Sequence, residues 1–237
     1  MEERKDLVEV SFKLSLEKHY DLLKEIYNID KNCKLNETEA FEWALKNNNV
    51  ELASRLIQSG ADVTADDNYA IRYAAANGHT EVVKLLIEAG ADVTTNNNYA
   101  IRYAAANGHA EIVKMLIEAG ADVTAVDNYA IRYAAKNGHT EVVKMLIEAG
   151  ADVAADDNYA IRYAAAYGHT EVVKLLIEAG ADVTADTIIY ATAYGHAEVA
   201  KMLIEARSDV DDYSIKSVFL DYISSQIRKL KNFLKNL

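Results

Sequence analysis

The feature that most constrains this chain is a 30-residue unit written four times in succession. The stretch NYAIRYAAANGHTEVVKLLIEAGADV begins at Asn68 and returns almost unchanged from Asn98, Asn128 and Asn158. Residues 61–90 and 151–180 differ at only two of their thirty positions. A period of 20–50 residues indicates an array in which neighbouring units cover one another's apolar surface. We therefore expect an elongated stack rather than a globule around one central core.

Each unit predicts two short helices separated by a glycine. The first is expected over residues 69–77, with Asp67 or Asn68 as a side-chain cap at its amino end. Gly78 supplies the left-handed backbone that ends it, and the second helix is expected over residues 80–89. Helices of about nine residues are marginal alone in water, so each must be stabilised by its neighbours.

Apolar residues in both segments recur at helical spacing, which predicts the side that each helix buries. The residues expected to face inward are Ile71, Ala74 and Ala75 in the first segment and Val82, Leu85, Leu86 and Ala89 in the second. The alanines of the first segment allow neighbouring helices to approach closely.

The second half of the unit, GHTEVVKLLIEAGADV, resembles the ankyrin repeat. That family's pattern runs T-P-L-H-x-A-A, then G-H-x-E-V-V-K-L-L-L and G-A-D-V, and its second half matches at residues 78–93, 108–123, 138–153 and 168–183. The first half reads Y-A-I-R-Y-A-A instead, and the unit is shorter than the usual 33 residues, with the loss in the finger turn. The chain has no proline. Such short, proline-free units also resemble the arrays of giant amoebal viruses.

The resemblance implies an all-α ankyrin-repeat solenoid with shortened finger turns and degenerate capping repeats at both ends. Atypical terminal units are expected because they close the open ends of a stack. The expected segments are an N-terminal helical cap over 1–34, a degenerate first repeat over 35–60, ankyrin-like repeats over 61–207 (61–90, 91–120, 121–150, 151–180 and a shortened 181–207), and a C-terminal helical cap over 208–237.

Charge and composition narrow the expected partners. A net charge of −12 argues against nucleic acid, whose binding depends on neutralised phosphates, and against an anionic membrane surface. No apolar run approaches the ~20 residues of a membrane span, and the amino end lacks the apolar core of a secretory signal. The single cysteine, Cys33, fits a reducing compartment. We expect a monomer in cytoplasm or nucleus, or in the host cytosol if the source is a virus or intracellular microbe.

Side chains that could bind a metal or act in catalysis recur once per unit and are not expected to meet at one site. A metal ion needs several ligands within about 2 Å, whereas packed helices lie about 8–10 Å apart. We therefore expect structural roles for the histidines of the G-H dipeptides, which are His79, His109, His139, His169 and His196. No nucleophile signature or phosphate loop is present, so we expect no catalytic residue, no metal and no cofactor.

The resemblance implies that the concave face, made by the first helices and finger turns, binds another protein. The residues that fall on those positions, or that differ between copies there, are Trp43, Asp66, Tyr73, Asn97, Tyr103, Val126, Tyr133, Lys136, Asp156, Tyr163, Tyr167 and Tyr190. We therefore expect a non-catalytic protein–protein interaction scaffold.

Several roles on this face stay open. The repeated Tyr73 position forms an aromatic ladder that either contacts a partner or packs between layers. Tyr69 and its copies are expected to brace the shortened finger. The arginines of the Arg72 position are expected to pair with finger acids, which are Asp66, Asp67, Asp127, Asp156 and Asp157.

The segment QIRKLKNFLKNL at 226–237 is basic and amphipathic. It is expected to cap the stack. A basic amphipathic helix can also dock on a membrane surface or a second protein. The alternative function is therefore an adaptor, in which the array holds a client and the C-terminal helix recruits a second factor.

Overall fold

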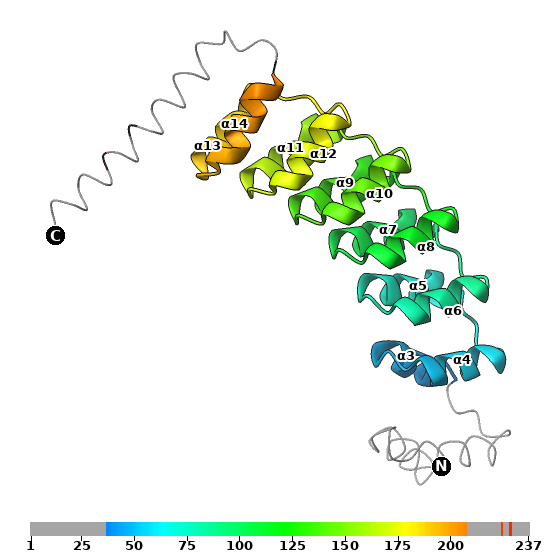
Figure 1. Ribbon diagram of the computed structural model, residues 1–237. Coiled ribbons are helices and arrows are strands. Elements are labelled where there is room, and N and C mark those ends of the chain that lie inside the picture. The colour runs from blue at the N-terminus through cyan, green and yellow to red at the C-terminus, as the bar shows by residue number, and fades with distance from the viewer. Residues whose placement is uncertain (1–36, 208–223, 225–227, 229–237) are drawn as a thin grey trace, which may run out of the picture. The chain divides into compact units, whose positions relative to one another are not determined.

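The computed structural model of the protein describes residues 37–207 together with Ser224 and Arg228 (Figure 1). Within these residues it contains twelve α-helices and no strand. The chain divides into two units, Met1–Asp62 and Val63–Leu237. The predicted caps over 1–34 and 208–237 lie outside the described residues, apart from Ser224 and Arg228. None of the helices described is long and apolar enough to cross a membrane.

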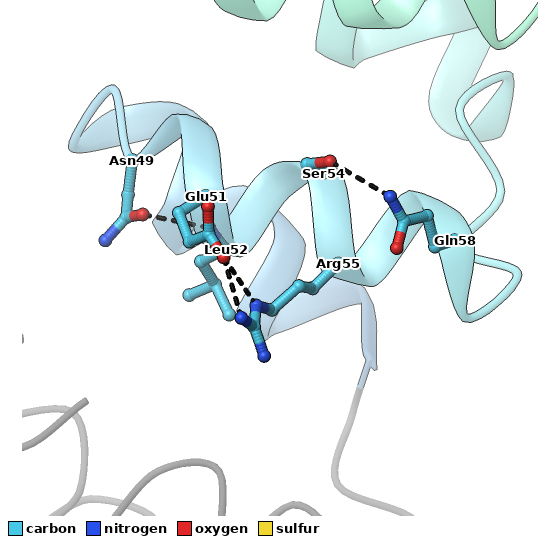
Figure 2. Close-up of polar contacts among 6 residues, drawn as sticks. All are labelled: Asn49, Glu51, Leu52, Ser54, Arg55 and Gln58. Atoms are coloured by element: carbon cyan, nitrogen blue, oxygen red, sulfur yellow. Dashed lines mark hydrogen bonds and ion pairs between the residues drawn. The ribbon is translucent and has the colours of Figure 1, made fainter. Parts of the chain in front are cut away.

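The first unit contains the helix pair α3 (Glu37–Lys46) and α4 (Val50–Gln58). Asn49 caps α4, because its Oδ1 accepts a hydrogen bond from the backbone N–H of Leu52 at 2.9 Å (Figure 2). One turn further on, Arg55 forms an ion pair with Glu51 at 2.7 Å. The buried apolar residues of this pair are Phe41, Ala44, Leu45, Ala53 and Leu56.

The second unit contains five helix pairs that follow the repeats. They are α5 (Ala65–Ala76) with α6 (Thr80–Glu88), α7 (Thr95–Ala106) with α8 (Ala110–Glu118), α9 (Ala125–Lys136) with α10 (Thr140–Glu148), α11 (Ala155–Ala166) with α12 (Thr170–Glu178), and α13 (Ala185–Ala193) with α14 (Ala197–Ala206). Each first helix packs on the next first helix, and each second helix on the next second helix (Figure 1). The unit is therefore a two-layered helical solenoid, as predicted.

The first-helix layer is held together by small side chains. Ile71, Ala74 and Ala75 have no exposed surface, and the same holds for their copies in the next three repeats. Alanine at two of these three positions lets the first helices approach closely, which confirms the predicted inward face. Closely packed interiors of this kind leave little room for a change in volume.

The second-helix layer follows the prediction with one exception. Val82, Val83 and Leu86 are fully buried, while Leu85 is half-buried. Ala89 was expected to face inward and is exposed. The reason is that α6 ends at Glu88 and Ala89 is its C-cap, so its side chain no longer follows the helical spacing.

Each finger of the four long repeats contains one turn of left-handed backbone. In the first of them Asp66 lies at φ 50°, ψ 52° and Asn68 at φ 57°, ψ 43°, and the right-handed helix begins only at Tyr69. The same three-residue turn recurs at 96–98, 126–128 and 156–158. This conformation costs L-residues about 1–2 kcal/mol each, least for Asp and Asn. This cost explains why the left-handed turns consist almost entirely of Asp and Asn.

Hydrogen bonds fix the left-handed turn at both ends. The N–H of Asn68 donates to the carbonyl of Thr64 at 3.0 Å. The guanidinium of Arg72 donates to the carbonyls of Asp67 at 3.0 Å and Asp66 at 2.8 Å. The arginine therefore satisfies two carbonyl groups that the change of helix hand leaves without a backbone partner.

The shortened repeat 181–207 has neither the turn nor the arginine. None of its non-glycine residues has a positive φ, and Thr184 caps α13 from an extended conformation by accepting from the N–H of Thr187. Ile189 stands at the position of Arg72. The three missing residues are thus those of the left-handed turn, and the arginine is absent where it has no carbonyls to bind.

An asparagine side chain links each long repeat to the next. The Oδ1 of Asn68 accepts a hydrogen bond from the backbone N–H of Asp92 at 2.8 Å, rather than capping its own helix as expected. The equivalent bonds join Asn98 to Asp122, Asn128 to Asp152 and Asn158 to Asp182. The first three of these asparagines are buried, so the finger is tied to its neighbour by a sheltered polar contact.

The histidines also bond between repeats. The Nε2 of His139 lies 3.0 Å from the carbonyl oxygen of Ala106, and that of His169 lies 3.0 Å from the carbonyl oxygen of Lys136. The expected structural role is therefore present, and the partner is the first helix of the preceding repeat.

Val126 is the one β-branched residue in these turns, and its replacement by aspartate is expected to stabilise the protein. Val126 lies at φ 55°, ψ 59°, where the other long repeats have Asp66, Asn96 and Asp156. Relief of this strain should raise the free energy of unfolding by about 1 kcal/mol, measured by urea denaturation. The reciprocal change Asn96→Val is the matched control and should lower it by a similar amount. Equal stability of Val126→Asp and the native protein would contradict the strain.

Candidate partner-binding surface

The structure places the predicted contact residues on first helices and their flanking turns. Four are in left-handed turns (Asp66, Asn97, Val126, Asp156), four lie on α5, α7, α9 and α11 (Tyr73, Tyr103, Tyr133, Tyr163), and Lys136, Tyr167 and Tyr190 lie at or near the carboxyl ends of α9, α11 and α13. Trp43 lies on α3 in the first unit and is half-buried.

Six tyrosines on α7, α9 and α11 form a continuous stack that we call the tyrosine column: Tyr99, Tyr103, Tyr129, Tyr133, Tyr159 and Tyr163. Within a helix the two rings stack with centroids 4.1 Å apart, as in Tyr129 and Tyr133. Between repeats the spacing is 5.7 Å, as in Tyr103 and Tyr129. Tyr69 and Tyr73 form a separate pair at 5.6 Å.

The column bears on both interpretations of the aromatic ladder. Its rings do pack between repeats, and all six remain half-buried rather than fully enclosed. That the Tyr69 position braces the finger stays a prediction for its copies Tyr99, Tyr129 and Tyr159. These rings stack on the tyrosine four residues later, because positions i and i+4 share one face of a helix.

The expected pairing of arginines with finger acids holds at one place. Arg132 forms an ion pair with the carboxylate of Asp156 in the next repeat. Elsewhere the arginines bind backbone carbonyls, and Arg102 does so with Asn97 and Asn96, which carry no charge. A carbonyl is present whatever the side chain, which explains why finger acids can be exchanged for asparagine.

Cations lie over the rings of the tyrosine column. The guanidinium of Arg102 is 5.2 Å from the centroid of Tyr129, and that of Arg132 is 5.0 Å from Tyr159. The ammonium of Lys136 lies 5.6 Å from Tyr133 and 5.3 Å from Tyr163. These distances fall within the range of cation–π attraction, so the cations and the rings of the column attract one another.

Crowding of the rings changes their acidity. Burial is the main cause that raises the pKa of Tyr159 to about 12, and a hydrogen bond with Tyr133 adds to it. Burial, with repulsion from Tyr103 and Tyr133, likewise raises the pKa of Tyr129. The packed column therefore favours neutral phenols.

Alkaline pH is expected to destabilise the array through Tyr159. Its pKa is near 10 when unfolded and about 12 when folded. The stabilisation is therefore complete below pH 10 and is lost as the pH rises toward 12. The free energy of unfolding should fall across that interval, and Tyr159→Phe should make the fall shallower in urea titrations. Tyr194→Phe, outside the column, controls for loss of a hydroxyl; equal slopes in both variants would contradict the assignment.

Exposed apolar side chains lie beside the column. In the described residues, the large apolar side chains that are clearly exposed are Val126 (44%), Tyr167 (54%), Tyr190 (41%) and Tyr194 (66%). Tyr194 was not among the predicted residues. Tyr194 occupies the position of Tyr167 in its repeat, where the other copies have asparagine. This replacement, seen in both repeats, could have identified Tyr194 from the sequence.

These observations define the class of the protein as a helical-repeat solenoid built from stacked two-helix units. A family model described as ankyrin repeats in three copies matches residues 12–97, 41–127, 73–157, 101–187 and 133–214. The matches together span 12–214, and the chain belongs to the ankyrin-repeat family. No curated protein matches the chain.

Ankyrin repeats are generally protein–protein interaction modules and typically form non-enzymatic scaffolds. Among the residues that the structure describes, no three His, Cys, Asp or Glu side chains are grouped so that they could hold a metal ion. The first-helix layer and its turns carry stacked phenols, arginines and exposed apolar groups.

Proposed function

We propose that the protein is a non-catalytic scaffold that binds a partner protein through its first helices and finger turns. The main support is the distribution of exposed apolar groups. Val126, Tyr167, Tyr190 and Tyr194 all belong to first helices or the turns beside them. Tyrosine is enriched at binding hot spots, because it gives a large contact area for little loss of side-chain entropy.

The second-helix layer offers a contrast within the same molecule. Its outward positions in the first long repeat are Glu81, Lys84 and Glu88, all exposed, and the next three repeats keep the same charged residues there. Lysine and glutamate are depleted in protein interfaces. This pattern is typical of a solvated face and favours the tyrosine side as the contact surface.

Hydrogen exchange on a captured complex tests the proposal without altering the protein. The full chain is used to capture partners from lysate, and amide exchange is compared with and without the bound partner. We expect slower exchange in the finger turns at 64–68, 94–98, 124–128 and 154–158, and little change in α6, α8, α10 and α12. Protection confined to the second helices would overturn the proposal.

A variant pair tests the same surface by affinity. Tyr73→Ala with Tyr190→Ala removes two rings that lie outside the tyrosine column, so the 4.1 Å stacks stay intact. Partner capture should fall several-fold, since truncation of interface aromatics commonly costs more than 1 kcal/mol. Glu111→Ala with Lys114→Ala on α8 is the matched control and should capture normally. Unfolding is monitored by circular dichroism.

A further inference from the structure

Lys136 is a charge that one repeat carries and the others lack. The equivalent residues are Ala76, Ala106 and Ala166. Its ammonium lies over Tyr133 of its own helix and over Tyr163 of the next helix, at 5.6 and 5.3 Å. The lysine therefore spans the junction of α9 and α11 on the face where the proposed function puts the partner.

The cations of this face differ in what they bind. Arg72 and Arg102 donate to finger carbonyls, and Arg132 pairs with a carboxylate. In the described part of the chain, the ammonium of Lys136 contacts only aromatic rings. An ammonium has three hydrogen-bond donors and a ring face satisfies none of them fully. Lys136 is thus held in place with its donors available to a ligand.

Tyr167, next to Lys136, replaces a structural asparagine. At the equivalent positions, Asn107 donates to the carbonyl of Ala76 and Asn137 donates to the carbonyl of Ala106, both at 2.8 Å. A phenol cannot reproduce that amide bond, and the ring of Tyr167 is 54% exposed. Its centroid lies 6.4 Å from that of Tyr163. The repeat has exchanged an inter-repeat hydrogen bond for an exposed aromatic ring beside the lysine.

Val126 is a second costly departure in the repeat that carries Lys136. It is strained at φ 55° and 44% exposed, and other repeats avoid the strain with Asp or Asn. Backbone strain of this kind marks functional sites when the fold gains nothing from it. Val126 and Lys136 lie at the two ends of α9, and Tyr167 is the C-cap of α11; we call these three non-repeating residues the strip.

We propose that this strip, resting on the proposed function, binds an extended acidic segment of another protein. An acidic side chain of the partner pairs with Lys136, where Tyr167 shields the contact from water, and an apolar side chain packs on Val126.

A displayed library of random nine-residue peptides, selected on the full chain, tests the proposal. We expect the selected peptides to share an Asp or Glu together with an apolar residue. Their affinity, measured by fluorescence polarisation with synthetic fluoresceinated peptides, should fall about tenfold or more on Lys136→Ala and remain within about threefold on Lys136→Arg. Val126→Asp should weaken binding although it stabilises the fold, and Lys84→Ala on α6 should leave binding unchanged.

The outcomes separate this inference from the proposed function. Peptides that lack a fixed acid, or that bind Lys136→Ala as well as the native protein, overturn the inference. If such peptides still bind the double variant Tyr73→Ala with Tyr190→Ala more weakly, the proposed function is supported while the inference about Lys136 fails. A library that yields no binder, or binders that footprint on the second helices, overturns both. Melting curves confirm that Lys136→Ala, which recreates the residue of neighbouring repeats, is folded.

Discussion

Replacing Gly138 by alanine is expected to lower the free energy of unfolding by about 2–5 kcal/mol. Gly138 lies between α9 and α10 at φ 78°, a conformation that L-residues rarely adopt. A Cβ atom there would meet the ring of His169 in the next repeat, 2.6 Å from its Nδ1 and 2.7 Å from its Cε1. The ring cannot move aside without losing its bond to the carbonyl of Lys136, which measures 3.0 Å.

Gly150 supplies the matched control for this substitution. It lies at φ 90°, and a Cβ atom there would have nothing within 4 Å. Gly150→Ala therefore carries the cost of the backbone conformation alone, about 1–2 kcal/mol. Urea denaturation followed by circular dichroism should rank the two variants clearly. Equal losses would show that the histidine ring does not lock the repeats together.

The Gly138 variant should also change the cooperativity of unfolding. A solenoid is held by contacts between nearest neighbours, so weakening one interface can divide the array into two unfolding blocks. The affected interface lies between residues 121–150 and 151–180. We expect a broader or two-step transition for Gly138→Ala and a single transition for Gly150→Ala.

Features that depend on local pattern could be predicted from the sequence. The start of the right-handed helix at Tyr69, the positive φ of Gly78 and the burial of Ile71 follow from capping, glycine chemistry and periodicity, all of which operate within a few residues. The two-layered solenoid followed from the repeat itself. The helix start and the glycine conformation rest on interactions inside one unit, whereas the burial of Ile71 and the solenoid follow from an apolar periodicity that recurs in every unit.

Features that join units could not be predicted, for a reason specific to identical repeats. The sequence is equally compatible with a hydrogen bond from His139 to its own loop and with one to the preceding repeat, since every copy carries the same donors and acceptors. The same ambiguity hid the partner of Asn68, which lies 24 residues away in the next repeat. Only the geometry of stacking distinguishes the two.

The left-handed turn was hidden by a different ambiguity. Asp and Asn favour helix N-caps and also tolerate left-handed backbone, so the letters Asp67 and Asn68 fit either structure. The arginine was the available signal. Arg72 and its copies are present in the repeats that have the turn, whereas Ile189 stands in the repeat that lacks it.

The candidate site stays a prediction. Copy-to-copy differences singled out Val126, Lys136 and Tyr167 in the sequence, because such differences are the only information that distinguishes one unit from another. The sequence alone does not show the surroundings of these residues. The strain at Val126 and the two rings beneath Lys136 arise from backbone hand and from stacking.

Replacing Asn128 by alanine is expected to cost about 2–4 kcal/mol, and replacement by aspartate much less. The Oδ1 of Asn128 accepts the N–H of Asp152 at 2.8 Å, and loss of a partner for a sheltered donor costs about 1–3 kcal/mol. Asn128 also lies at φ 58°, ψ 38°, where alanine adds about 1 kcal/mol. Aspartate keeps both the acceptor oxygen and the tolerance of left-handed backbone.

Amide exchange identifies the cause of any loss at Asn128. In Asn128→Ala the N–H of Asp152 should exchange faster than in the native protein, while that of Asp122, held by Asn98 at 2.8 Å, should not change. Asn128→Asp should protect both. If Asn128→Ala and Asn128→Asp lose equal stability, the hydrogen bond between repeats contributes nothing, because aspartate keeps the acceptor oxygen. If the aspartate variant recovers most of the loss, the finger is a fastener between units, and the shortened repeat 181–207 lacks it because its finger has no such turn.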